Sequence, residues 1–310
     1  MLLLAGVVHG KTSRDLDAEL LESASGRHLV RPKRNPGSSH RREGREREFR
    51  GVGVKFYIES VDVQVAFYRQ LEFVLSPERL AAYGGDHAEG VSPQGLGLAR
   101  YLLNMALCES LYGSLQMCEV GLRNAIHREL TKLYGREDWY DCDAFNLTNW
   151  AQGEVTKAKA QITKEGKPIT PGRVIAEMNF GFWTSLFESH YEQQTLFLPA
   201  GIKGVFPHLP KSQHRRKERK ADLENIRQLR NRVFHHERII HWKDLDSRHQ
   251  QVHAVIGWLS PSLQHMAQTV DRFAELRKAG LKPWIDLIQA NWPEVGDAGL
   301  SGFGGSQLGL

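Results

Sequence analysis

The residues best suited to chemistry gather in one segment, Leu223–Glu237. If it is helical, Arg230 falls inside the apolar stripe, a position that a surface arginine avoids because an unpaired buried charge is costly. Asn231 and His235 flank Arg230 as an i, i+4 pair. A guanidinium, an amide and an imidazole at one helix edge can bind an anion, donate hydrogen bonds and transfer protons near neutral pH. The alternative is an arginine that reaches solvent or pairs with a buried acid, beside ordinary surface histidines.

A second row of polar residues lies at i, i+4, i+8 on a segment that starts near Ser114: Glu119, Arg123 and His127. One interpretation is an intrahelical salt bridge with an exposed histidine. The other is a wall of the same site, in which Glu119 or Arg123 contacts the segment that carries Arg230.

Two further motifs are rejected. Residues 5–12 satisfy the phosphate-binding loop pattern [AG]-x4-G-K-[ST], but such a loop needs an α/β sheet behind it, and a basic low-complexity segment follows. His236-Glu237-Arg238-Ile239-Ile240-His241 nearly matches H-E-x-x-H, but its second histidine comes one residue too late for both rings to face one metal ion. We therefore expect no metal ligands and no cofactor.

The elements that must position these residues are mostly helices. Ser76-Pro77 indicates a helix start, and Gly113 a break or bend within a long helical stretch. The strand signals, at Val52–Tyr57 and Val61–Tyr68, are few and weak, and the aromatic residues Phe180, Phe182, Trp183 and Phe187 are expected in the core. The expected fold is an all-α bundle, with helical segments at 95–134, 148–165, from Thr170 through Trp183, from Lys217 to the His235 region, and 247–278.

Charge is unevenly distributed along the 310 residues, whose formal net charge is +5. Residues 27–50 contain nine basic and three acidic residues, about +6, and residues 1–26 carry −2, so residues 51–310 carry about +1. We therefore expect residues 1–50 to form a disordered basic arm and the Gly-rich residues 291–310 a flexible tail. Residues 51–310 are nearly neutral, so we do not expect them to bind nucleic-acid phosphates by non-specific electrostatic attraction.

Composition also excludes some classes of protein. No apolar run approaches the roughly 20 residues of a membrane span, so no membrane partner is expected. Three cysteines are too few for a disulfide framework or a four-thiolate zinc site. They suggest buried thiols in a reducing compartment, and the expected location is cytoplasmic.

Residues 230–237, Arg-Asn-Arg-Val-Phe-His-His-Glu, resemble the R-N-x-x-x-H signature (R-x4-6-H) of HEPN domains, and more specifically the Abi-like (abortive infection) family of bacterial phage-resistance proteins. Four other segments resemble that family and occur in its order: Leu75–Leu80, Leu115–Asn124, Phe180–Trp183 and Phe206–Pro207. The resemblance covers roughly residues 65–260. It implies a HEPN-like helical bundle with additional helices, placed here at residues 51–290.

The resemblance further implies a metal-independent endoribonuclease of the toxin type, acting in phage defence as a homodimer, with RNA as substrate and an antitoxin as a candidate partner. The RNA 2′-OH would attack the adjacent phosphate and leave a 2′,3′-cyclic phosphate. Arg230 would bind the phosphate, His235 would transfer the proton and Asn231 would orient them. Secondary candidates are His236, Arg232, Glu237, Glu119 and Arg123, and the spacing rule accepts either His235 or His236.

Three alternatives stay open. The basic run before the segment, with Arg215, Arg216 and Lys217, is either a solvated helix start or a guide for RNA. The whole chain could be a non-catalytic protein that binds RNA or a partner through the same helix. It could also be a toxin regulated by nucleotidylation or by a neighbouring antitoxin.

Overall fold

The computed structural model describes residues 63–85 and 91–291. These residues all belong to one compact unit of the chain, residues 58–310. Residues 1–50, with the phosphate-loop pattern, and residues 292–310 of the expected tail lie outside the described residues, as does the strand expected at Val52–Tyr57.

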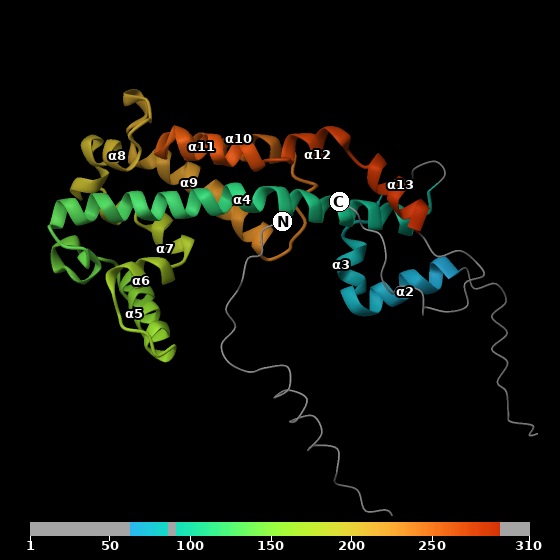
Figure 1. The fold of residues 1–310 in the computed structure, drawn as a ribbon, viewed down its shortest axis with the longest axis horizontal. Helices are drawn as coiled ribbons and strands as arrows, with labels where there is room; N and C mark the ends of the chain where they lie inside the picture. The colour runs from blue at the N-terminus through green and yellow to red at the C-terminus, as the bar shows by residue number, and fades with distance from the viewer. Residues whose placement is uncertain (1–62, 86–90, 292–310) are drawn as a thin grey trace, which may run out of the picture. The chain divides into compact units, whose positions relative to one another are not determined.

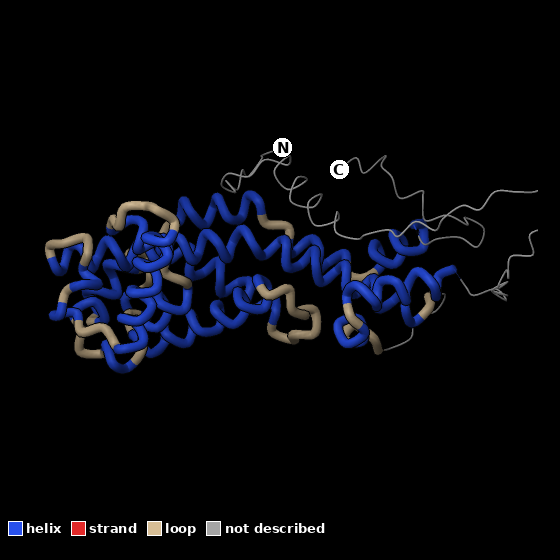
Figure 2. Tube along the Cα trace, turned by 90° about the horizontal axis from the view of Figure 1, so that it is seen from below, coloured by secondary structure: helices blue, strands red, loops and turns tan. Residues whose placement is uncertain are grey.

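Within the described residues the fold is all-helical and contains no strand, as the tube in Figure 2 shows. The α-helices are α2 (Val63–Leu75), α3 (Pro77–Ala81), α4 (Pro93–Tyr134), α5 (Asn149–Lys164), α6 (Pro171–Glu177), α7 (Phe180–Ser185), α8 (Pro199–Val205), α9 (Arg216–Phe234), α10 (Leu245–Leu259), α11 (Pro261–Val270), α12 (Phe273–Ala279) and α13 (Lys282–Asn291). Short 3-10 helices occur at Trp139–Asp141, Asp143–Phe145, Ser189–Tyr191, Thr195–Phe197 and Lys211–Gln213. None of the described helices is both long and apolar enough to cross a membrane.

Helix α4 is the central element. Its 42 residues extend about 63 Å, and both of its ends are capped: Ser92 Oγ accepts from Gly95 N at 3.1 Å, and Gly135 ends the helix with φ 66°. Its buried stripe is Leu103, Leu107, Leu111, Leu115, Cys118, Leu122, Ile126 and Leu130. Helices α9 to α13 all contact α4, as do α7 and α8.

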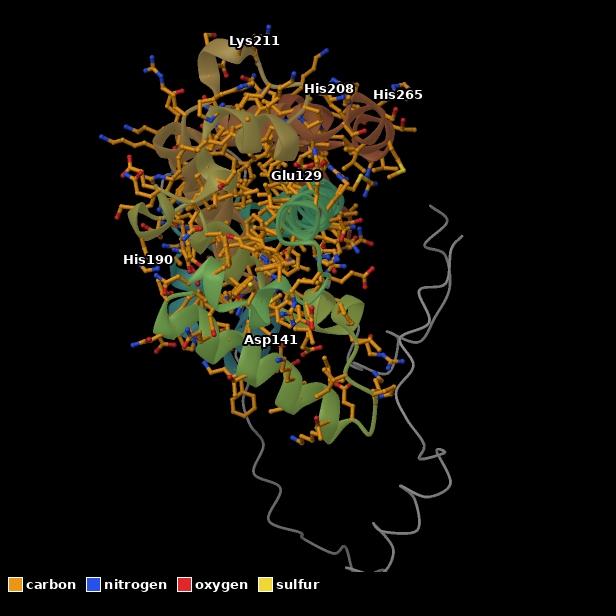
Figure 3. The ribbon with its side chains drawn as sticks, turned by 90° about the vertical axis from the view of Figure 1, so that its left-hand side faces the viewer. Glu129, Asp141, His190, His208, Lys211 and His265 are labelled. Atoms are coloured by element: carbon orange, nitrogen blue, oxygen red, sulfur yellow. The ribbon has the colours of Figure 1, made fainter. Side chains whose placement is uncertain are left out.

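Helices α10 and α11 and helix α5 lie on different sides of α4 (Figure 1). Figure 1 shows α10 and α11 along one side and α5 on the other. Figure 3, viewed along α4, shows His208 and His265 on the first side and Asp141 on the second. The core near Asp141 is aromatic, and the Trp139 ring contacts Phe145, Phe182 and Trp183 with centroids 5.4–6.4 Å apart. The expectation that Phe180, Phe182, Trp183 and Phe187 are core residues is confirmed.

Several expected boundaries are confirmed and others are wrong. Helix α3 begins at Pro77, and Ser76 Oγ accepts from Arg79 N at 3.3 Å. The weak strand signal at Val61–Tyr68 is wrong, because α2 begins at Val63. The alternating valines suggested a strand, but Phe67, Leu71 and Leu75 continue at helical spacing. Gly113 does not break α4, which runs through it.

Two predicted helices are divided, the first at one capping residue and the second at two. Asn179 starts α7, where its Oδ1 accepts from Phe182 N at 2.9 Å, so the helix opened by Thr170–Gly172 ends before Phe180. Ser260 and Pro261 end α10 and start α11. Asp271 follows α11, and its Oδ1 accepts from Phe273 N at 2.8 Å. Short polar side chains that bind the next turn's N–H groups therefore set these boundaries.

Candidate functional site

The R-N-x-x-x-H segment lies on α9 and the turn that follows it. Helix α9 ends at Phe234, and the His235 N–H donates to the Asn231 carbonyl at 2.9 Å. His236 has φ 57°, in the left-handed region that favours glycine. The apolar stripe expected for this helix comprises Leu223, Ile226, Leu229, Val233 and Phe234. The first four are buried and Phe234 is half-buried.

Arg230 is held in place by two neighbours. Its side chain is 24% exposed, and its Nε donates to Oε2 of Glu119 on α4 at 3.2 Å. The guanidinium lies 4.2 Å from the centroid of the Phe234 ring, and Phe234 in turn stacks on Tyr112 at 4.9 Å. The arginine in the apolar stripe thus has both an acidic partner and an aromatic face.

Unlike Arg230, Asn231 and His235 have side chains without described polar partners. Their side chains make no hydrogen bond or ion pair within the described residues, and the His235 and His236 side chains are exposed. Arg232 is engaged instead with Glu237, with Nη1 and Oε2 2.5 Å apart. The structure therefore leaves an unengaged amide and imidazole one helical turn apart, next to an anchored guanidinium.

The turn after α9 is fixed by a residue that the sequence reasoning missed, Asn104 of α4. Asn104 is 3% exposed, and its Oδ1 accepts from the N–H groups of Ile239 and Ile240 at 2.8 and 3.1 Å. Its Nδ2 donates to the Glu237 carbonyl at 3.3 Å. Arg79 also donates to the His236 carbonyl. An asparagine three and seven residues before Leu107 and Leu111, on their face of the helix, was the available signal.

A groove opens beside this end of α9. Its volume is about 730 Å³, and its walls come from α2 to α4 and from the end of α9. Most of the lining is apolar or aromatic: Val74, Leu75, Tyr83, Tyr101, Met105, Cys108, Tyr112, Val233 and Phe234, with Arg79, Asn104, Glu109 and His236 as the polar members. Met105 and Tyr112 are about half exposed, so the groove offers apolar surface directly beside His236.

Of the second polar row, Glu119 is the residue with a described hydrogen bond to α9. Arg123 donates to the Ala176 carbonyl at 3.3 Å. Nδ1 of His127 accepts from Trp139 Nε1 at 3.0 Å, and burial lowers the pKa of His127. The contact between Glu119 and the segment that carries Arg230 is therefore present, and the intrahelical Glu119–Arg123 salt bridge is not.

The basic run at the start of α9 is partly structural. Arg216 is 11% exposed at its side chain, donates to the Phe187 carbonyl and faces Glu192 at 3.5 Å. Arg219 is buried over Trp258, 4.5 Å from its ring centroid. Arg215 and Lys217 are exposed, so these two are the members of the run that a polyanion can reach.

Other reactive groups do not extend this site. Burial raises the pKa of Cys108 to about 11 and that of Cys118 to about 12, so these thiols are poor nucleophiles at neutral pH. Residues 236–241 are not helical, and His236 and His241 belong to no metal-ligand cluster among the described residues. Among the described residues, the one cluster of potential metal ligands comprises His249, His253 and Asp271.

Comparison with known proteins adds no relative: no protein family, no curated protein and no solved structure matches the chain.

Proposed function

We propose that the protein is an endoribonuclease that cleaves RNA without a metal ion at the end of α9. The observation that carries the proposal is the exposed His235 imidazole, with no described side-chain partner, one turn beyond the anchored Arg230. The 2′-OH attacks the adjacent phosphate, and His235 transfers a proton, from the attacking 2′-OH as general base or to the leaving 5′ oxygen as general acid. The 5′ oxygen leaves, and the products are a 2′,3′-cyclic phosphate and a 5′-OH end.

The Glu119–Arg230 contact is compatible with phosphate binding. A guanidinium has five N–H donors, and Glu119 faces Nε alone at 3.2 Å, which leaves other donors for the non-bridging oxygens. Glu119 and Phe234 fix the plane of the guanidinium, so less side-chain entropy is lost when a phosphate binds. Asn231, without a described partner, orients His235 or the phosphate.

We propose that the active form is a homodimer in which both chains contribute to the site. Its proposed biological role is that of a toxin in phage defence by abortive infection, and an antitoxin is proposed to control it. The family resemblance supports this, as does the apolar groove beside the site. Expression is then expected to stop cell growth, and the His235→Ala variant to relieve the arrest. Equal growth with either version would remove the support for a toxin.

A non-catalytic binding protein is the second candidate. The apolar lining of the groove favours it, because nine of its thirteen lining residues are apolar or aromatic and such a surface suits a protein partner better than an RNA backbone. Under this proposal, binding of RNA or of a partner survives both Arg230→Ala and His235→Ala, and no cleavage occurs.

Cleavage of labelled bulk tRNA by the purified protein in excess EDTA tests the first proposal. Wild type, Arg230→Ala, His235→Ala and His236→Ala are compared with Arg215→Ala, which removes an exposed arginine at the opposite, N-terminal end of α9. We expect wild-type cleavage with 2′,3′-cyclic phosphate ends, at least 100-fold slower cleavage in the His235 and Arg230 variants, as is typical of lost acid–base or electrostatic catalysis, and a smaller loss in the control. Equal cleavage by all variants would refute the assignment of the site.

A further inference from the structure

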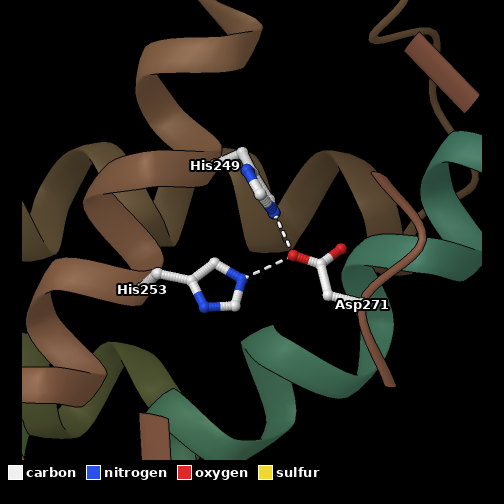
Figure 4. Close-up of side chains that lie close together, drawn as sticks. All are labelled: His249, His253 and Asp271. Atoms are coloured by element: carbon white, nitrogen blue, oxygen red, sulfur yellow. Dashed lines mark hydrogen bonds and ion pairs between the residues drawn. The ribbon is translucent and has the colours of Figure 1, made fainter. Parts of the chain in front are cut away.

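Two histidines and an aspartate outside the proposed RNA site converge on one point. His249 and His253 lie four residues apart on α10, so both rings project from the same face. Asp271 lies in the connection between α11 and α12. Figure 4 shows Nε2 of each ring directed at the same oxygen, Oδ2 of Asp271, at 2.6 Å from His249 and 2.8 Å from His253.

These three side chains are largely removed from water and firmly held. Their exposed fractions are 14%, 9% and 12% for His249, His253 and Asp271. The His249 ring stacks on Phe273 at 4.3 Å, and Asp271 Oδ1 accepts from Phe273 N. Nδ1 of His253 is buried and has no hydrogen-bond partner among the described residues, so the described polar contacts of this ring are at its Nε2 edge. The donor atoms are therefore fixed before any ligand arrives.

We propose that His249 Nε2, His253 Nε2 and an oxygen of Asp271 bind one divalent transition metal ion of the zinc class. The three candidate donor atoms lie within 4.8 Å of one another. Two imidazoles and one carboxylate are a ligand set that such ions favour, and three protein ligands leave a coordination position for water. Bonds of about 2.0 Å in tetrahedral geometry place neighbouring ligand atoms about 3.3 Å apart. The separations of 2.6 and 2.8 Å between each Nε2 and Asp271 Oδ2 therefore have to widen by about 0.5–0.7 Å to admit the metal.

The cluster also has an entry path. An open depression of about 310 Å³ is lined by the three residues together with Gln250, Ala254, Gln264 and Gln268. It gives the ion access from solvent and leaves room for the water ligand. Because the ligands come from α10 and from the connection after α11, a bound ion would clip these two segments together and stabilise the folded chain.

Metal binding is tested on tag-free full-length protein, stripped with EDTA and dialysed against Zn²⁺ or Co²⁺. We expect one tightly held Zn²⁺ per chain by elemental analysis, and visible ligand-field absorption from Co²⁺. The His249→Ala and Asp271→Asn variants are expected to lose both. The amide introduced by Asp271→Asn keeps an oxygen that can accept from Phe273 N, so this variant is expected to fold, and circular dichroism checks each variant. The matched control is His265→Ala, which removes an exposed histidine of α11 (Figure 3).

Thermal unfolding gives a second readout. Zn²⁺ at about 100-fold over its Kd is expected to raise the Tm of wild type and of His265→Ala by about 5–10 °C, and to leave that of the two ligand variants unchanged. No Zn²⁺ bound by wild type, or equal binding by wild type and the folded Asp271→Asn variant, would overturn the proposal. The result is independent of RNA cleavage, which is assayed in EDTA.

Discussion

Replacement of Asn104 by alanine is the sharpest test of how the candidate site is held. The amide of Asn104 makes three hydrogen bonds to the backbone of residues 237–240, the turn that follows His235 and His236. Each bond contributes about 1 kcal/mol net, so their loss costs about 3 kcal/mol. The Ile239 N–H is left buried without its partner, which adds about 1 kcal/mol, and the better helix propensity of alanine returns about 0.6 kcal/mol. The expected loss in the free energy of unfolding is therefore about 3 kcal/mol.

The assay is urea unfolding followed by circular dichroism, and the matched control is Asn124→Ala. Asn124 is exposed on the same helix, so its replacement gains only helix propensity and is expected to stabilise the protein by about 0.5 kcal/mol. The two substitutions are chemically identical and have opposite predicted signs. A loss below about 1 kcal/mol for Asn104→Ala, with an unchanged slope of the urea dependence, would refute the argument that this amide fixes the turn.

Three further predictions concern other parts of the fold. Gly201→Ala is expected to lower the free energy of unfolding by at least about 3 kcal/mol, because a Cβ there would lie 2.4 Å from the Leu196 carbonyl oxygen. Gly153 has open space around it, so Gly153→Ala is expected to raise the free energy of unfolding by about 0.5–1 kcal/mol. Similar urea midpoints for the two variants would contradict this prediction. Burial lowers the pKa of His127 in the folded chain, so the unfolded chain binds the proton first as the pH falls. His127 therefore contributes stability above pH 6.5 that is lost as the pH falls through the lower folded pKa. His127→Gln is expected to reduce the difference in unfolding free energy between about pH 7.5 and 5.5, and an unchanged difference would exclude this histidine as its source. Glu119→Gln is expected to lower stability by about 1 kcal/mol, with little further loss when Arg230→Met is added, whereas additive losses in this double-mutant cycle would show that the pair does not couple.

Helix content was predictable from the sequence because caps and apolar periodicity agree. Ser76-Pro77 and the stripe of α9 specify their elements locally, and both are found. The divisions at Asn179, Ser260 and Asp271 were missed because a side chain that caps the next turn looks like any other polar residue within a periodic pattern. At Gly113 a break or bend was expected, but α4 continues through this residue. Burial of the apolar residues on either side stabilises the helix despite the low helix propensity of glycine.

The candidate site was predictable only where one helix carries it. The position of Arg230 in an apolar stripe signalled a partner, and the structure supplies Glu119. The role of Asn104 in holding residues 237–240 depends on a contact across more than 130 positions, which no local pattern contains. His249, His253 and Asp271 are similar: the i, i+4 histidines are visible in the sequence, but the aspartate that joins them lies beyond a helix boundary that the sequence analysis did not place.

The length of α4 has a consequence for synthesis of the chain. This helix leaves the ribosome before α9 to α13 exist, and all five of these contact it. The last of these five partners, α13, is complete only after roughly 150 further residues, which takes about 8–30 s at ordinary translation rates. During that time part of its leucine stripe has nothing to cover it, so nascent or truncated chains that end before α9 are expected to aggregate or to occupy chaperones. Helix α4, around which most of the other helices pack, thus depends in part on segments that are synthesised late to bury its apolar residues.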